Sequence, residues 1–128
     1  MNLLLDTHLL LWAAGEPERL SSGAKELIED SANRLFFSAI NLWEVTIKND
    51  LGRNDFNVDP HLLRRGLLEN GYEELPITAH HVLGVNHLPP IHKDPFDRML
   101  IAQAEYEGFL LLTADQKILQ YPGPLRAV

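Results

Sequence analysis

The sequence predicts an α/β fold, a three-layer α/β/α sandwich with a mainly parallel sheet, and two patterns support this prediction. Short continuous apolar runs, such as Leu3–Leu5 and Phe109–Leu112, have the length and composition of buried strands. Segments with apolar residues three or four positions apart, which is typical of helices, alternate with these runs. Parallel strands need such crossover helices, and right-handed crossovers place them on both faces of the sheet. We expect residues 1–128 to form a single domain.

The first half of the chain predicts two strands, each followed by a helix. Gly15 is a plausible helix end, Ser21 or Ser22 can cap a helix, and Ser38 stands where the cap of the next helix belongs. The expected elements are a strand over Leu3–Leu5, a helix over Thr7–Ala14, a helix from Ser21 or Ser22 to about Asp30, a strand over Leu35–Phe37 and a helix over Ala39–Leu51.

The second half continues the alternation. Proline at position 60 or 95 favours the start of a helix, and Gly71 and Gly108 favour an end. The expected elements are a helix over Pro60–Glu69, a strand over Leu75–Ile77, a short helix over Thr78–Val85, a loop over Asn86–Asp94, a helix over Phe96–Glu107, a strand over Phe109–Leu112, a short helix over Ala114–Leu119 and an edge strand within Gln120–Val128.

Composition narrows the class of protein. The absence of cysteine excludes a disulfide scaffold, a thiolate zinc site and a cysteine nucleophile. Eleven Lys and Arg against eighteen Asp and Glu give a net charge of −7, so nucleic acid would be bound through metal ions or a local basic patch. The longest apolar stretch, Leu9–Ala14, is far below the roughly 18 residues that span a membrane. We therefore expect a cytoplasmic protein that does not associate with membranes.

Four carboxylates are predicted to gather at one edge of the sheet. In open α/β sheets, functional groups collect beyond the carboxyl ends of the strands. Asp6 follows the first expected strand, and Asp115 follows the strand that ends at Leu112. Glu44 and Asp97 each share a helix face with apolar residues, so both should point toward the body of the protein.

Four other residues are secondary candidates at the same edge. Asp94 and Thr113 are secondary metal-site candidates, and Ser38 and Arg98 are candidate substrate contacts. Structural roles remain open for several of these positions. Asp6 and Asp94 also suit helix N-caps. Glu44 and Lys48 have the spacing of an exposed helical ion pair, and Arg98 is equally suited to pair with an acid.

The residue types define the chemistry of the predicted site. Converging carboxylates repel one another and raise one another's pKa unless a cation neutralises them. Hard oxygen ligands suit Mg²⁺ or Mn²⁺, and such an ion can activate a water and stabilise the leaving oxygen of a phosphodiester. The predicted chemistry is metal-dependent phosphodiester or phosphoryl hydrolysis.

Four segments in order, LLLDTHLLLWAAG, FFSAINLWEVTIK, PPIHKDPFDRMLIAQAEYEG and LLLTADQKI, resemble the PIN-domain ribonucleases of the VapC toxin type. The resemblance extends over essentially the whole chain. It implies a PIN fold, a Mg²⁺- or Mn²⁺-dependent endoribonuclease acting on RNA, an antitoxin protein as partner and a homodimer. By position, the four acidic residues of the family motif fall on Asp6, Glu44, Asp97 and Asp115. Ala114 stands where the family has a basic residue, which puts a cationic substrate contact there in doubt.

Two other functions remain as alternatives. A Mg²⁺-dependent phosphatase of the haloacid dehalogenase type needs a second aspartate two residues after the first, and His8 occupies that position. A non-catalytic PIN-like binding module would keep the fold and lose the metal, but all four carboxylates are present. The ribonuclease is the favoured interpretation, with cleavage that leaves a 5′-phosphate and a 3′-hydroxyl.

Overall fold

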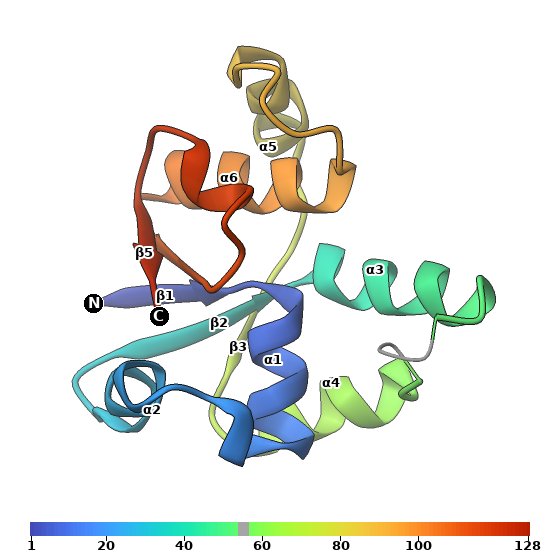
Figure 1. The fold of residues 1–128 in the computed structure, drawn as a ribbon, viewed down its shortest axis with the longest axis vertical. Helices are drawn as coiled ribbons and strands as arrows, with labels where there is room; N and C mark the ends of the chain where they lie inside the picture. Colours follow the sequence, from blue (N-terminus) through green and yellow to red (C-terminus); the bar gives the residue numbers. More distant parts are fainter. Residues whose placement is uncertain (54–56) are drawn as a thin grey trace.

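The computed structural model describes residues 1–53 and 57–128 (Figure 1). The strands are β1 (Asn2–Leu5), β2 (Arg34–Ser38), β3 (Glu73–Leu75), β4 (Leu110–Thr113) and β5 (Leu125–Ala127). The α-helices are α1 (Thr7–Gly15), α2 (Ser22–Glu29), α3 (Ala39–Asp50), α4 (Pro60–Glu69), α5 (Ala79–Gly84) and α6 (Pro95–Glu107). Short 3₁₀ turns are η1 (Pro17–Arg19), η3 (Val85–His87) and η4 (Ile118–Gln120).

The five strands form one parallel sheet in the order β3-β2-β1-β4-β5. The chain builds the sheet outward from β1 in one direction through β2 and β3, and then in the other through β4 and β5. The order therefore reverses beside β1, at the position where open α/β sheets bind their ligands. Leu5 pairs with Leu112, so Asp6, which follows β1, lies next to Thr113 at the end of β4.

Helices cover both faces of the sheet, as predicted (Figure 1). Helices α1, α2 and α4 lie on one side, and α5 and α6 lie on the other. Alternate residues of β1 serve the two layers, because Leu3 and Leu5 belong to the core beneath α1 while Leu4 belongs to the core beneath α6. The fully apolar run Leu3–Leu5 is explained by this burial on both faces.

Side-chain caps fix where the helices that carry the site begin. Asp6 accepts a hydrogen bond from the Leu9 N–H at the start of α1, and Asp94 does the same for two N–H groups at the start of α6. Ser38 and Asn41 form a capping box at the start of α3. Helix α6 ends at Gly108, whose φ of 72° is the left-handed conformation that favours glycine. The predicted helix boundaries around these caps are confirmed to within a residue or two.

Two predicted elements need correction. The third strand was expected over 75–77 and lies at Glu73–Leu75, because Pro76 has no N–H to extend the ladder beyond the Ser38–Leu75 pair. The helix expected over 114–119 is replaced by a turn and the 3₁₀ segment η4. The N–H groups of Asp115 and Lys117 bond locally to the side chains of Thr113 and Asp115, and these bonds compete with a helix.

None of the helices in the described residues is long and apolar enough to cross a membrane.

Helix α4 offers a direct test of which face supports the fold. Leu63 is 4 % exposed in the core, whereas its neighbour Leu62 is 57 % exposed. We expect Leu63→Ala to lower the free energy of unfolding by about 2–5 kcal/mol, because it leaves a cavity. Leu62→Ala is the matched control and should change stability by less than about 0.5 kcal/mol. Urea denaturation measures both, and equal effects would contradict this packing.

Candidate metal centre

Asp6 lies at the point where β1 passes into α1, beside the end of β4. One carboxylate oxygen, Oδ1, accepts the Leu9 N–H at 2.9 Å, and the other, Oδ2, accepts the Thr113 hydroxyl at 2.5 Å. The residue is buried, and burial raises the pKa of its carboxyl above the usual value. Asp6 is thus both the cap of α1 and a member of the edge predicted to hold metal, so the two interpretations of this residue are compatible.

Glu44 projects from the second turn of α3 and is also buried. Its Oε1 accepts the Thr7 hydroxyl at 2.5 Å, and its Oε2 accepts a hydrogen bond from Lys48 Nζ at 2.6 Å. The predicted pair with Lys48 therefore exists, but the Lys48 side chain is only 15 % exposed. This is an ion pair inside the site rather than on the surface. Lys48 Nζ also lies 3.8 Å from Asp94 Oδ2, so it connects α3 with the start of α6.

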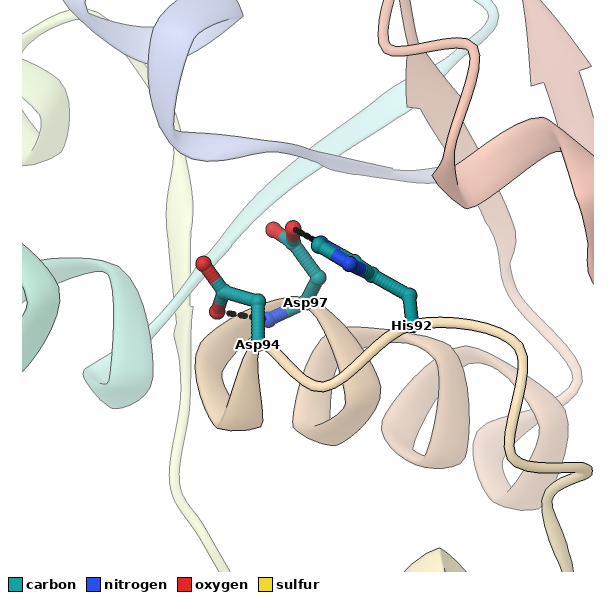
Figure 2. A group of neighbouring side chains, drawn as sticks. All are labelled: His92, Asp94 and Asp97. Carbon is teal, nitrogen blue, oxygen red and sulfur yellow. Dashed lines mark hydrogen bonds and ion pairs between the residues drawn. The ribbon is translucent and has the colours of Figure 1, made fainter.

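Asp94 and Asp97 lie at the N-terminal end of α6, with His92 in the loop before it (Figure 2). Oδ1 of Asp94 accepts the N–H groups of Phe96 and Asp97, as expected for a cap. The imidazole of His92 faces Asp97, with 2.9 Å between Nε2 and Oδ2 (Figure 2). One ligand atom from each of His92, Asp94 and Asp97 lies within 4.8 Å of the others, a spacing that suits one metal ion.

Asp115 stands at the exposed rim of the site, just beyond β4. Its N–H donates to Thr113 Oγ1 at 2.9 Å, and its Oδ1 accepts the Lys117 N–H. Thr113 therefore links the two acidic residues that follow neighbouring strands, because its hydroxyl also donates to Asp6.

The pKa of Asp97 shows that the five acids influence one another. The pKa of Asp97 rises to about 8, chiefly because the group is buried and further because of the negative charges of the other four acids. Those four are Asp94, Glu44, Asp115 and Asp6. A cation among them would remove both the repulsion and the need for a proton on Asp97. The carboxylates supply hard oxygen donors, and they therefore fit a divalent ion such as Mg²⁺ or Mn²⁺.

A cavity of about 210 Å³ opens next to Asp6 and Asp115. The rest of its lining is His8, Leu9, Trp12 and Ala114. His8 and Trp12 also line a larger cavity of about 600 Å³ that reaches Arg19. Both carboxylates can therefore be approached from solvent.

The two predicted substrate contacts, Ser38 and Arg98, both bond to other groups of the protein. Ser38 is fully buried, and its hydroxyl donates to Gln103 Oε1 at 2.6 Å while it caps α3. The guanidinium of Arg98 donates to Tyr121 Oη and to backbone carbonyls of the segment before α6.

Sequence reasoning missed three residues of this site. Thr7 was only the first residue of an expected helix, yet its hydroxyl donates a hydrogen bond to Glu44. Lys48 was expected in an exposed ion pair, and His92 was not among the candidate metal-site residues. The signal for His92 was present in the pattern His-x-Asp-x-x-Asp over 92–97, since a loop that turns into a helix can bring these three side chains together.

These features, a parallel sheet with acids clustered at its switch point, are typical of metal-dependent hydrolases of the α/β class. A family model described as the PIN domain matches residues 3–124. The chain therefore belongs to the PIN domain family, and the predicted resemblance is confirmed. A curated relative, Ribonuclease VapC22 of Mycobacterium tuberculosis, is 30 % identical over 123 residues, which cover 95 % of this chain and 93 % of the relative.

Solved structures share the fold at lower identity. VapBC2 from Rickettsia felis, bound to a DNA fragment from their promoter, aligns with a TM-score of 0.70 at 17 % identity and covers 99 % of this chain and 98 % of that one. DNA-bound VapBC from Salmonella typhimurium gives 0.67 at 14 % identity over 100 % and 97 % of the two chains. The PIN domain endonuclease Utp24 gives 0.57 at 18 % identity over 99 % and 84 %.

The raised pKa of Asp97 predicts how the metal-free protein responds to pH. The folded protein keeps this carboxyl protonated to about pH 8, whereas an unfolded chain ionises it near 3.8. Its contribution to stability is complete below pH 4 and is lost as the pH rises through 8. In EDTA we expect Asp97→Asn to be more stable than the wild type at pH 8.5, by about 1 kcal/mol or more, since one pKa unit is worth about 1.4 kcal/mol.

Thermal unfolding between pH 5 and 8.5 measures this effect. Asp50→Asn, at the exposed end of α3, is the matched control and should follow the wild-type pH dependence. A melting temperature of Asp97→Asn that falls with pH as steeply as that of the wild type would show that Asp97 ionises without cost.

Proposed function

We propose that this PIN-domain protein is a metal-dependent endoribonuclease and the toxin of a toxin–antitoxin pair. The observation that carries the proposal is the convergence of five acids at the switch point of the sheet, where burial and the four neighbouring negative charges raise the pKa of Asp97 to about 8. The relative named Ribonuclease VapC22 supports RNA as the substrate. An acidic protein has little attraction of its own for RNA, so binding must depend on the metal and on local contacts.

Asp6, Glu44, Asp97 and Asp115 are the proposed metal-binding and catalytic residues, and Asp94 is a further candidate beside Asp97. Bound Mg²⁺ or Mn²⁺ would lower the pKa of a water for attack on phosphorus and stabilise the leaving oxygen. The protein's own part is to fix the acids. Thr113 orients Asp6, and Thr7 and Lys48 orient Glu44. With water as the nucleophile and the 3′ oxygen as the leaving group, which takes up a proton, the products would carry a 5′-phosphate and a 3′-hydroxyl.

The proposal includes two protein partners, an antitoxin and a second copy of this chain. The structural neighbours named VapBC support an antitoxin partner. A cationic segment of that antitoxin would be attracted to the acidic rim around Asp115. The homodimer implied by the resemblance stays a prediction.

Cleavage of defined RNA oligonucleotides tests the activity. We expect cutting with Mg²⁺ or Mn²⁺, none with EDTA, and at least a 100-fold slower rate for Asp6→Asn, since a metal supplies several kcal/mol to such reactions. Asp50→Asn is the charge-matched control and should cut like the wild type. Products ending in 2′,3′-cyclic phosphate would rule out the water mechanism.

Mn²⁺ titration separates the nuclease from a non-catalytic PIN-like module. The nuclease should bind Mn²⁺ in the wild type and lose affinity in Asp6→Asn. Folded wild-type protein that binds no Mn²⁺ and cuts none of the RNAs would favour the module.

A further inference from the structure

We propose that His92 is a positioning residue that fixes Asp97 for metal binding, and that Arg98 and Tyr121 hold His92 in place. The inference rests on the proposed function and adds to it three residues outside the acidic motif. It starts from the Nε2–Oδ2 distance of 2.9 Å between His92 and Asp97 (Figure 2). When Asp97 is ionised, the proton of this hydrogen bond must come from the imidazole. His92 Nε2 then donates to Oδ2, and Oδ1 stays available to a cation.

Burial makes this hydrogen bond effective. The side chains of His92 and Asp97 are 18 % and 14 % exposed, so water competes little for either group. A ligating carboxylate is commonly held by a hydrogen bond from a residue that does not touch the metal, and loss of such a partner typically weakens metal binding 10- to 100-fold. His92 has the position and the donor for this role.

The hydroxyl of Tyr121 binds both the backbone N–H and the backbone carbonyl of His92. Its hydroxyl accepts the His92 N–H at 2.8 Å and donates to the His92 carbonyl at 2.9 Å. Tyr121 is itself buried beside η4, in the core beneath α6. His92, whose imidazole faces Asp97, is therefore held by a residue close to the C-terminus of the chain.

Arg98 completes this support from the first turns of α6. Its Nη1 donates to Tyr121 Oη at 3.0 Å and to the Pro89 carbonyl at 3.0 Å, and its Nη2 donates to the Val85 carbonyl at 3.2 Å. One guanidinium thus ties the loop before α6 to the helix that carries Asp97. A planar group with five donors can make such a set of bonds, whereas lysine cannot. None of these bonds involves an acidic residue proposed to bind metal, so the support of the loop does not itself depend on the ion.

Mn²⁺ affinity, measured by the electron paramagnetic resonance signal of free Mn²⁺, tests the role of His92 without relying on RNA cleavage. His92→Phe keeps a planar ring and loses the donor, and we expect a dissociation constant 10- to 100-fold higher. His92→Gln places an amide N–H near the position of Nε2, and we expect it to restore affinity to within about threefold of the wild type, because the donor alone is required. Both variants should unfold at a similar temperature.

Tyr121→Phe tests the support and has a matched control in the same structure. It removes one oxygen atom, and we expect Mn²⁺ affinity about tenfold weaker. Tyr106→Phe, on α6 and 55 % exposed, should bind Mn²⁺ like the wild type. Wild-type affinity in His92→Phe would overturn the inference. So would a directly bonded nitrogen in the magnetic resonance spectrum of bound Mn²⁺, because His92 would then be a ligand.

Different results would contradict the proposed nuclease activity and the proposed role of His92. If the wild type cuts RNA with Mn²⁺ while His92→Phe and Tyr121→Phe bind the ion normally, the positioning role is wrong and the nuclease stands. If the wild type binds no Mn²⁺, the metal-dependent nuclease is wrong and the positioning role falls with it.

Discussion

Mutual repulsion among buried carboxylates is the constraint on which this structure depends. Five acids meet where β1, β4, α3 and α6 come together, and the fold must keep them close although their charges oppose it. In the described residues, two features reduce the repulsion between the acids. Lys48 neutralises part of the charge near Glu44 and Asp94, and the pKa of Asp97, raised to about 8 by burial and by the other acids, favours its neutral form. What remains is a site that gains stability when a divalent cation binds, since binding to the folded state alone stabilises it.

The rest of the architecture positions these charges accurately. The parallel register that pairs Leu5 with Leu112 places Asp6 beside Thr113, and the serine cap of α3 sets where Glu44 projects. Buried hydroxyl groups then orient the carboxylates, because each donates a hydrogen bond to one carboxylate oxygen. Threonine serves twice in this way, at positions 7 and 113.

The sequence predicted the fold and the main acids because both follow local rules. An apolar run followed by aspartate identifies the end of a buried strand, and the spacing of Ile40, Glu44 and Ile47 places a carboxylate on an inward helix face. The roles of Ser38 and Arg98 were not predictable in the same way. Their partners, Gln103 and Tyr121, lie 65 and 23 positions away, and only tertiary packing selects them. The third strand was predicted two residues too late, because the sequence pattern around Pro76 does not reveal which residues of this segment pair with β2.

The hydrogen bond between Thr113 and Asp6 joins residues 107 positions apart. During synthesis Asp6 leaves the ribosome well ahead of Thr113, by roughly 5–20 s at ordinary rates of translation. Until β4 arrives, β1 lacks a neighbour on one side, and Asp6 lacks both Thr113 and Asp115. A nascent chain therefore carries an incomplete acidic site. Any activity of the finished site begins only after the ribosome has synthesised β4 and Asp115.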